Sequence, residues 1–246
     1  MAVVSDDVLS DLLGKAGISF VGTVERIGAA TLSDVPVNNR TAVVRVDRVL
    51  DAPPSLSHLA HDEVTVLLAS DAAPGQQFAF FTDAAVLGKT LAVTEVGRLP
   101  ASEVAPHVAQ ARTSTVQPLD PIRRKMDASE LRAHAGAAEV VVVGRIIRLE
   151  QVGEERYSEH APHYWRATLQ VQHVEKGNVS GEVSFIYPAS RDVQWVGAPK
   201  PEARQQGLWI LHATTGSESS LAPFKLLHAD DFRPVQHLDT LREAAN

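Results

Sequence analysis

The sequence predicts a mainly β protein made of two tandem small barrels, each closed by five strands and flanked by short helices. The main observation is an internal repeat, in which β-rich stretches of the first half return in the same order in the second half. The offsets of about 119 to 130 residues indicate duplicated domains, because solenoid repeats run roughly 20–50 residues. The matched segments are Val21–Val24 with Val143–Ile146, Glu63–Val66 with Glu182–Phe185, and Leu91–Ala92 with Leu221–Ala222.

Composition narrows the function classes. The 246 residues are 44% hydrophobic and 22% charged, which is ordinary for a globular protein of one or two domains. The absence of cysteine excludes disulfides, thiolate zinc sites and a cysteine nucleophile, and it fits a reducing compartment. The first residues lack the pattern of a secretory signal, and no apolar run approaches the roughly 20 residues of a membrane span, so we expect a cytoplasmic protein without membrane association. Alanine- and arginine-rich usage is typical of a high-GC bacterium.

The first unit, expected over residues 1–112, opens with a short amphipathic helix. Ser5 is the expected N-cap, with Asp6 and Asp7 in the first turn, where carboxylates favour the positive end of the helix dipole. Strands are expected where apolar residues alternate between turn signals, and Glu103–Arg112 has the spacing of a closing helix. The expected strands are 18–27, 40–50, 63–69, 77–82 and 90–96.

The second unit, expected over residues 122–246, repeats this order after a linker over 113–121. The linker is indicated by its threonines and by Pro118 and Pro121. A short helix is expected over 127–135 and a closing helix over 236–244. The expected strands are 139–151, 165–174, 182–187, 207–212 and 224–227.

Five short strands per unit leave two open edges unless the sheet curls onto itself. Gly22 and Gly144 stand inside the first strand of each unit, where tight coiling requires a residue without a side chain. This pattern predicts two OB-like barrels, named for the oligonucleotide/oligosaccharide-binding fold. A pair of seven-stranded sandwiches is the alternative, but each unit has too few strands for it.

The second unit resembles the netrin-like or tissue-inhibitor-of-metalloproteinase-like OB barrel. The resemblance rests on Ala138–Ile146, on Ala167–Gly177 with its Val-x-Lys-Gly ending, and on Gly181–Phe185. The first unit matches less well, with Asp51-Ala52 where Lys-Gly would stand. The inhibitors of that family depend on an N-terminal cysteine and on disulfides, so the resemblance implies the barrel and not protease inhibition.

Two loop segments carry residue types that bind metals. His160 and His163 stand beside Glu159, and His58 and His61 form a similar pair in the first unit. Imidazoles three residues apart can both reach one ion. The two pairs lie in non-equivalent places, and neither forms the His-Glu-x-x-His helix motif. We therefore interpret them as solvated loop histidines, and expect no cofactor.

The aromatic residues suggest a recognition surface. All tyrosines and tryptophans fall in the second unit: Tyr157, Tyr164, Trp165, Tyr187, Trp195 and Trp209. One interpretation places Trp209 in the core, at the position of Ala79, and lets Trp195 anchor a long loop. The other is an exposed patch of Tyr164, Trp165 and Trp195, near Arg191, that contacts a partner.

Nucleophile-elbow, phosphate-loop and dinucleotide motifs are absent, so we expect no enzyme. The net charge of −7 and the lack of a basic stripe disfavour nucleic acid. The basic run Arg123-Arg124-Lys125 is interpreted as solvated charge. The sequence thus predicts a non-catalytic tandem binding module for another protein, such as an adaptor or an assembly component. Binding of single-stranded nucleic acid or glycan by the barrel faces is the alternative, and metal-dependent hydrolysis a third.

Overall fold

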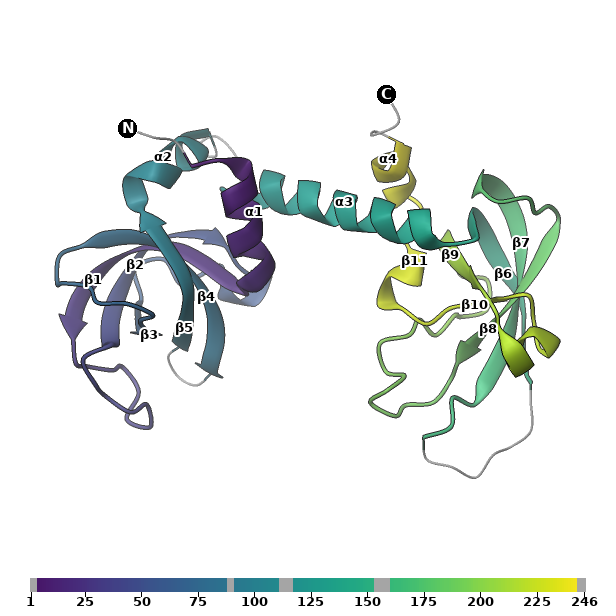
Figure 1. The fold of residues 1–246 in the computed structure, drawn as a ribbon, viewed down its shortest axis with the longest axis horizontal. Helices are drawn as coiled ribbons and strands as arrows, with labels where there is room; N and C mark the ends of the chain where they lie inside the picture. The colour runs from purple at the N-terminus through teal and green to yellow at the C-terminus, as the bar shows by residue number, and fades with distance from the viewer. Residues whose placement is uncertain (1–3, 88–90, 111–116, 153–159, 243–246) are drawn as a thin grey trace. The chain divides into compact units, whose positions relative to one another are not determined.

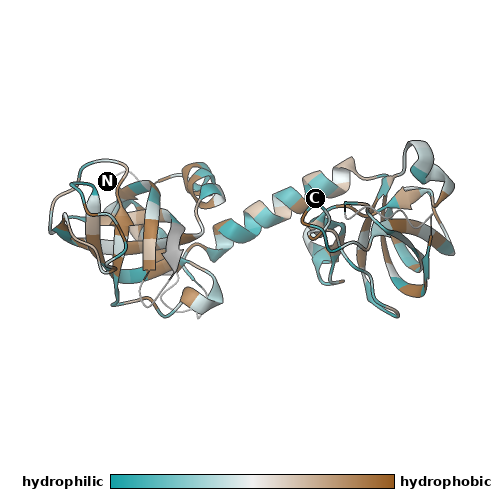
Figure 2. Cartoon of the chain, turned by 90° about the horizontal axis from the view of Figure 1, so that it is seen from below, coloured by the Kyte–Doolittle hydropathy of each residue, from teal (hydrophilic) through white to brown (hydrophobic). Residues whose placement is uncertain are grey.

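A computed structural model describes residues 4–87, 91–110, 117–152 and 160–242 of the chain (Figure 1). The chain divides into two compact units, Met1–Met126 and Asp127–Asn246. Each contains a closed five-stranded barrel, which confirms the predicted fold class. In Figure 2 the barrel strands carry interleaved apolar and polar residues, as expected for sheets with one face toward a core.

The first barrel closes in the strand order β1-β2-β3-β5-β4, with β4 pairing back onto β1. β3 and β5 run parallel, and the other neighbours run antiparallel. Ser5 caps the first helix as predicted, since its side chain accepts from the amide of Val8. The elements are α1 (Asp6–Lys15), β1 (Ile18–Ile27), β2 (Thr41–Asp51), η1 (Pro54–Leu56), β3 (Glu63–Leu67), β4 (Gln77–Leu87), β5 (Leu91–Pro100) and α2 (Ala101–Gln110).

The second barrel closes in the equivalent order, β6-β7-β8-β10-β9. The short strand β10 lies parallel to β8 and antiparallel to β9, and thereby completes the ring. A further strand, β11, extends the sheet beyond β9. The elements are β6 (Val140–Gln151), β7 (Tyr164–Lys176), β8 (Glu182–Pro188), β9 (Gln206–Ala213), η3 (Gly216–Ser220), β10 (Phe224–Lys225), η4 (Ala229–Asp231), β11 (Phe232–Arg233) and α4 (His237–Arg242).

Helix α3 (Asp120–Ala137) begins seven residues earlier than the expected 127–135 helix, inside the expected linker. Pro121 stands in its first turn, where a missing amide hydrogen costs nothing, so this proline does not mark a loop. Arg123 is partly buried and paired: it donates to Asp51 Oδ2 at 2.5 Å and to the carbonyl of Leu13 at 3.1 Å. Lys125 pairs with a carboxylate of α1, so two of the three basic residues are engaged within the first unit.

Strand register shows which residues of the two barrels correspond. Gly22 lies opposite Val46, Gly144 lies opposite Val171, and bulges flank both glycines at matching places. A Cβ on Gly144 would lie 2.6 Å from the carbonyl oxygen of Gln170, so only glycine fits this bend. The repeat therefore extends to the backbone distortions that close the barrels.

The register also corrects two sequence matches. Val93 pairs with Val66, and Phe224 pairs with Phe185, so Val93 corresponds to Phe224 and the Leu91–Ala92 match is wrong by one residue. On β9, Trp209 pairs with Val142 of β6. Val142 corresponds to Phe20 of β1, and Phe20 pairs with Phe80. The counterpart of Trp209 is therefore Phe80 and not Ala79, because the loop lengths of the two units differ.

Each of the two cores contains a pair of aromatic rings in contact. The ring centroids of Phe20 and Phe80 are 5.5 Å apart in the first barrel, and those of Phe185 and Trp209 are 5.6 Å apart in the second. Trp209 is fully buried, and its indole Nε1 donates to the carbonyl of Gly144 at 3.1 Å. The interpretation that places Trp209 in the core is therefore confirmed.

In each barrel a third ring packs against the pair, and the strand that supplies it differs between the two barrels. In the first barrel Phe78 of β4 packs edge-on against Phe80, with centroids 5.7 Å apart. In the second barrel the position of Phe78 is Gly207, and Phe232 of β11 packs against Trp209 at 4.6 Å. A Cβ on Gly207 would overlap the Phe232 ring. The third ring thus comes from β4 itself in the first barrel, and in the second barrel from β11, the strand paired with β9.

Candidate functional site

Loops gather at one end of the second barrel, where β7 begins and β8 ends. Tyr164 and Pro188 pair at this end, the segment 189–205 starts from it, and Glu218 of η3 is bonded to Tyr164 (Figure 1). OB barrels bind ligands with such loops and with the adjacent strands. The predicted aromatic patch would lie at this end, because Tyr164, Trp165 and Trp195 all belong to these segments.

The loop over 189–205 is held by side-chain hydrogen bonds. Trp195 Nε1 donates to the carbonyl oxygen of His160 at 3.2 Å, and His160 Nδ1 lies 2.8 Å from Asp192 Oδ2. The Lys200 ammonium donates to the carbonyls of Trp195, at 3.0 Å, and Pro188. Trp195 therefore anchors the loop, as one of the two interpretations of the aromatic residues stated.

The electrostatics of these groups follow from their surroundings. The backbone amide of Gln194 and then the His160 imidazole lower the pKa of Asp192, because both favour the carboxylate form. Burial lowers the pKa of Lys200, since desolvation penalises the ammonium. Both side chains act on the loop backbone, so they fix its conformation.

The same loop presents apolar side chains to solvent. Val193 is 89% exposed and Val196 is 68% exposed, while Trp195 between them is half-buried. Arg191 is exposed beside them. A loop that is tied down by its polar groups and displays branched apolar side chains has the features of a contact surface.

The structure places the other two predicted aromatics elsewhere. Trp165 packs against the core of the second barrel. Tyr164, one residue earlier on β7, points to the opposite side, where its hydroxyl donates to Glu218 Oε1 at 2.5 Å. Burial, followed by the neighbouring Glu218 carboxylate, raises the pKa of Tyr164. Since alternate residues of a strand face opposite ways, Tyr164, Trp165 and Trp195 do not form one patch.

Glu218 ties η3 to the barrel in a manner that depends on pH. Burial acts to raise its pKa, but hydrogen bonds from Lys225 and Tyr164 outweigh it and hold the pKa below the ordinary 4.5. A carboxyl with a lowered folded pKa stabilises above its unfolded pKa, and loses that contribution as pH falls through the folded value.

We expect Glu218→Gln to cost about 1 kcal/mol of unfolding free energy at neutral pH, and less on acidification below about pH 4. Urea unfolding of both proteins at a series of pH values measures the difference. A difference that stays constant with pH would contradict this role of the carboxylate.

The predicted metal candidates are not brought together. His160 is engaged with Asp192, His163 is exposed, and Glu159 lies outside the described residues. His58 and His61 are exposed in the loop before β3. In the part of the chain that the structure describes, the histidines and carboxylates that converge as a possible metal-binding group are different ones.

That group consists of His134, His212 and Asp231, which come from α3, β9 and η4. Asp231 is fully buried, and its Oδ1 lies 2.7 Å from His134 Nε2 and 2.9 Å from His212 Nε2. The ring of His228 lies edge-on to both imidazoles, with centroids 5.5 and 5.8 Å away. Sequence reasoning missed this group because its members are far apart in the chain and form no motif.

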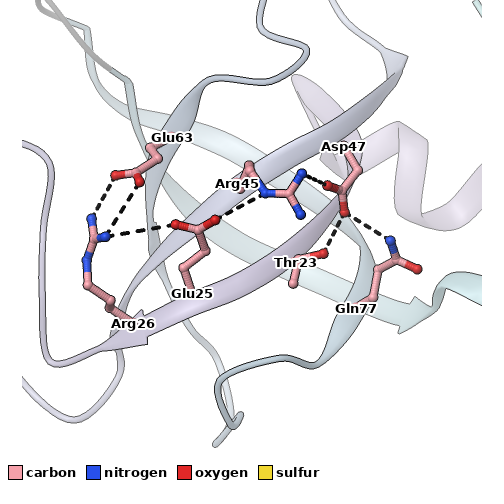
Figure 3. A network of polar contacts seen from close by, with 7 residues as sticks. All are labelled: Thr23, Glu25, Arg26, Arg45, Asp47, Glu63 and Gln77. Atoms are coloured by element: carbon pink, nitrogen blue, oxygen red, sulfur yellow. Dashed lines mark hydrogen bonds and ion pairs between the residues drawn. The ribbon is translucent and has the colours of Figure 1, made fainter.

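The outer face of the first barrel carries a ladder of polar side chains across β4, β1, β2 and β3 (Figure 3). Arg26 pairs with Glu63 at 2.7 Å, and Arg45 joins Glu25 at 3.1 Å to Asp47 at 2.8 Å. Thr23 and Gln77 complete it by donating to Asp47. The three carboxylates therefore occupy both guanidinium groups.

The second barrel keeps one link of this ladder. Gln206 donates to Gln172 at 2.8 Å, as Gln77 donates to Asp47 in the first barrel. Arg145 and Ile147 stand where Thr23 and Glu25 stand in the first barrel, and Ile147 is exposed. The two outer faces have thus diverged in charge while the backbone stayed the same.

Fold and surface together define a tandem OB-like barrel protein whose second unit carries an ordered apolar loop and a buried histidine–aspartate group. No protein-family model matches the chain, and no curated protein sequence matches it significantly. Among the described residues, none of the helices has the length and apolar character needed to span a bilayer.

Proposed function

We propose that the protein is a non-catalytic tandem binding module of the cytoplasm, an adaptor or assembly component that contacts another protein through the 189–205 loop. The observation that carries this proposal is the display of Val193 and Val196 on a loop fixed by Trp195 and Lys200. A loop already ordered before binding loses less conformational entropy on association. The fitting partner has an apolar surface bordered by a carboxylate for Arg191.

The charges on the outer face of the first barrel favour a polyanion such as nucleic acid less than they favour a protein partner. Its outer-face ladder holds three carboxylates against two guanidinium groups, all engaged with one another. Nucleic-acid affinity depends on cations that exchange salt counterions for phosphates. A titration with single-stranded oligonucleotides at several salt concentrations tests this alternative, and tight, steeply salt-dependent binding would replace the protein-binding proposal.

We expect the Val193→Glu and Val196→Glu variants to weaken partner binding by at least about tenfold each. Burying one valine contributes about 1.5–3 kcal/mol, and 1.4 kcal/mol corresponds to a factor of ten in Kd. The partner is first captured from native cells with the tagged chain and identified by mass spectrometry. Binding is then measured with the purified pair by calorimetry.

Val37→Glu is the matched control, because Val37 is also an exposed valine, at 54%, but lies in the first unit. It should leave the affinity unchanged. A partner that binds the two loop variants as tightly as the wild-type protein would show that this loop is not the contact surface.

A further inference from the structure

We propose that His134, His212 and Asp231 form a binding site for one divalent transition-metal ion, with Zn²⁺ as the ion best suited. The three side chains offer two imidazole nitrogens and one carboxylate oxygen, all within 4.8 Å of one another. This donor set is one that Zn²⁺ takes in proteins, and it leaves the fourth position of a tetrahedral site for water. The proposal is independent of the protein-binding loop.

The carboxylate is positioned as metal-ligating carboxylates are. Asp231 Oδ2 accepts hydrogen bonds from the backbone amides of Leu227, at 2.6 Å, and His228, at 2.8 Å. Oδ1 is thereby turned toward the two imidazoles. Hydrogen bonds that fix a ligand from behind orient it toward the metal.

Charge gives the second argument. Asp231 is fully buried, and within the described residues only the two histidines form ion-pair contacts with it. A buried carboxylate without a compensating cation costs several kcal/mol, so it is normally paired or bound to a metal. A divalent ion between Oδ1 and the two Nε2 atoms would supply that charge with neutral imidazoles.

The three ligand atoms need to move apart only slightly to hold Zn²⁺. Ligand atoms of a tetrahedral zinc site lie about 3.3 Å apart, given metal–ligand distances of about 2.0–2.1 Å. The two N···O distances of 2.7 and 2.9 Å are therefore about half an ångström too short. The imidazoles of His134 and His212 are 20% and 21% exposed, so the group is in contact with solvent.

Such an ion would fasten parts of the second unit that are distant in sequence. Asp231 is 97 residues from His134 and 19 residues from His212. Because the unfolded chain has no preformed site, binding free energy becomes folding free energy. In a chain without cysteine or disulfides, the site would serve to stabilise the second barrel.

The test uses the full-length protein, stripped with a chelator and titrated with Zn²⁺ alone. We expect one ion per chain by elemental analysis after dialysis, and a rise in Tm of several degrees at saturation. Mg²⁺, which prefers oxygen ligands, should have no such effect. Co²⁺ in place of Zn²⁺ should give the visible absorption of a four-coordinate site.

His134→Gln and His212→Gln are the informative variants. The glutamine amide can still donate to Asp231, so the hydrogen-bonded cluster is kept while a metal ligand is lost. We expect each to weaken Zn²⁺ binding by more than about 100-fold, since even losses around the ligands cost 10–100-fold. The double variant His160→Ala, His163→Ala is the control for Zn²⁺ binding. It should bind Zn²⁺ as tightly as the wild-type protein.

The outcomes separate the possibilities. If the wild-type protein retains no stoichiometric Zn²⁺, or both glutamine variants retain it, the proposal is overturned and the group is a hydrogen-bonded cluster only. Loss of Zn²⁺ in the His160 and His163 control would overturn it as well, by moving the site to the loop.

Discussion

Replacing Trp209 with alanine is expected to lower the unfolding free energy of the second unit by about 3–5 kcal/mol. Trp209 is fully buried and contacts the rings of Phe185 and Phe232. Its loss leaves a cavity where three rings meet, and also removes the donor to the carbonyl of Gly144. This is a large part of the roughly 5–15 kcal/mol that stabilises a domain.

The repeat supplies the control for this prediction. Phe80 occupies the same position in the first barrel, so Trp209→Phe introduces the side chain that the corresponding strand of the first barrel carries. We expect it to cost less than half as much as alanine. Urea unfolding followed by circular dichroism gives the free energies, and hydrogen exchange assigns the loss to residues 127–246. A cost for alanine below about 1 kcal/mol would contradict the central role of this ring.

Gly144→Ala should destabilise the second barrel by about 2–3 kcal/mol. The new Cβ would lie 2.6 Å from the Gln170 carbonyl oxygen and 2.9 Å from Leu169 Cγ. The nearer atom belongs to the paired strand's backbone, so the barrel itself would have to open. Gly22→Ala should act in the same way on the first barrel, where Val44 Cγ1 lies 2.6 Å from the corresponding Cβ position.

Gly136→Ala, near the end of α3, is the matched control. Apart from its chain neighbours and the backbone of its own helix, no atom lies within 4 Å of its Cβ position, and alanine favours helix over glycine by about 0.5–1 kcal/mol. The same substitution should therefore be neutral or stabilising there. Equal effects at Gly136 and Gly144 would show that the strand glycine is not required for barrel closure.

Much of the fold could be predicted because it depends on local patterns. Alternating apolar residues placed β2 at 40–50, and the structure has Thr41–Asp51. Ser5 and the two aspartates after it placed the start of α1. The internal glycines indicated coiling because no other residue fits a bend where two backbones meet.

The errors arose where the signal was short or ambiguous. β11 contains only Phe232 and Arg233, too few residues for a periodic pattern, and it pairs with β9, where Phe232 packs on Trp209. The start of α3 was placed too late because Pro121 is compatible with both a loop and a first helical turn. The sequence matches between the two units were wrong by one residue at β9 and before β10, because the loop lengths of the two units differ.

The candidate site was predicted only in part. Trp195 and Arg191 lie on an ordered loop, as part of the predicted site. The sequence did not predict that Val193 and Val196 are exposed beside them, since single valines form no functional pattern. Tyr164 and Trp165 are neighbours in sequence and face opposite ways. Whether an aromatic is exposed depends on the strand's orientation to its core, which the sequence of one strand does not state.

The sequence by itself determined the duplicated organisation, the five strands of each barrel and the glycines at their bends, because periodicity and backbone sterics act between residues close in the chain. Only the tertiary structure decided which aromatics became core, and that α3, β9 and η4 deliver two imidazoles to one buried carboxylate. Such contacts depend on barrel closure, which brings together side chains that no local pattern connects.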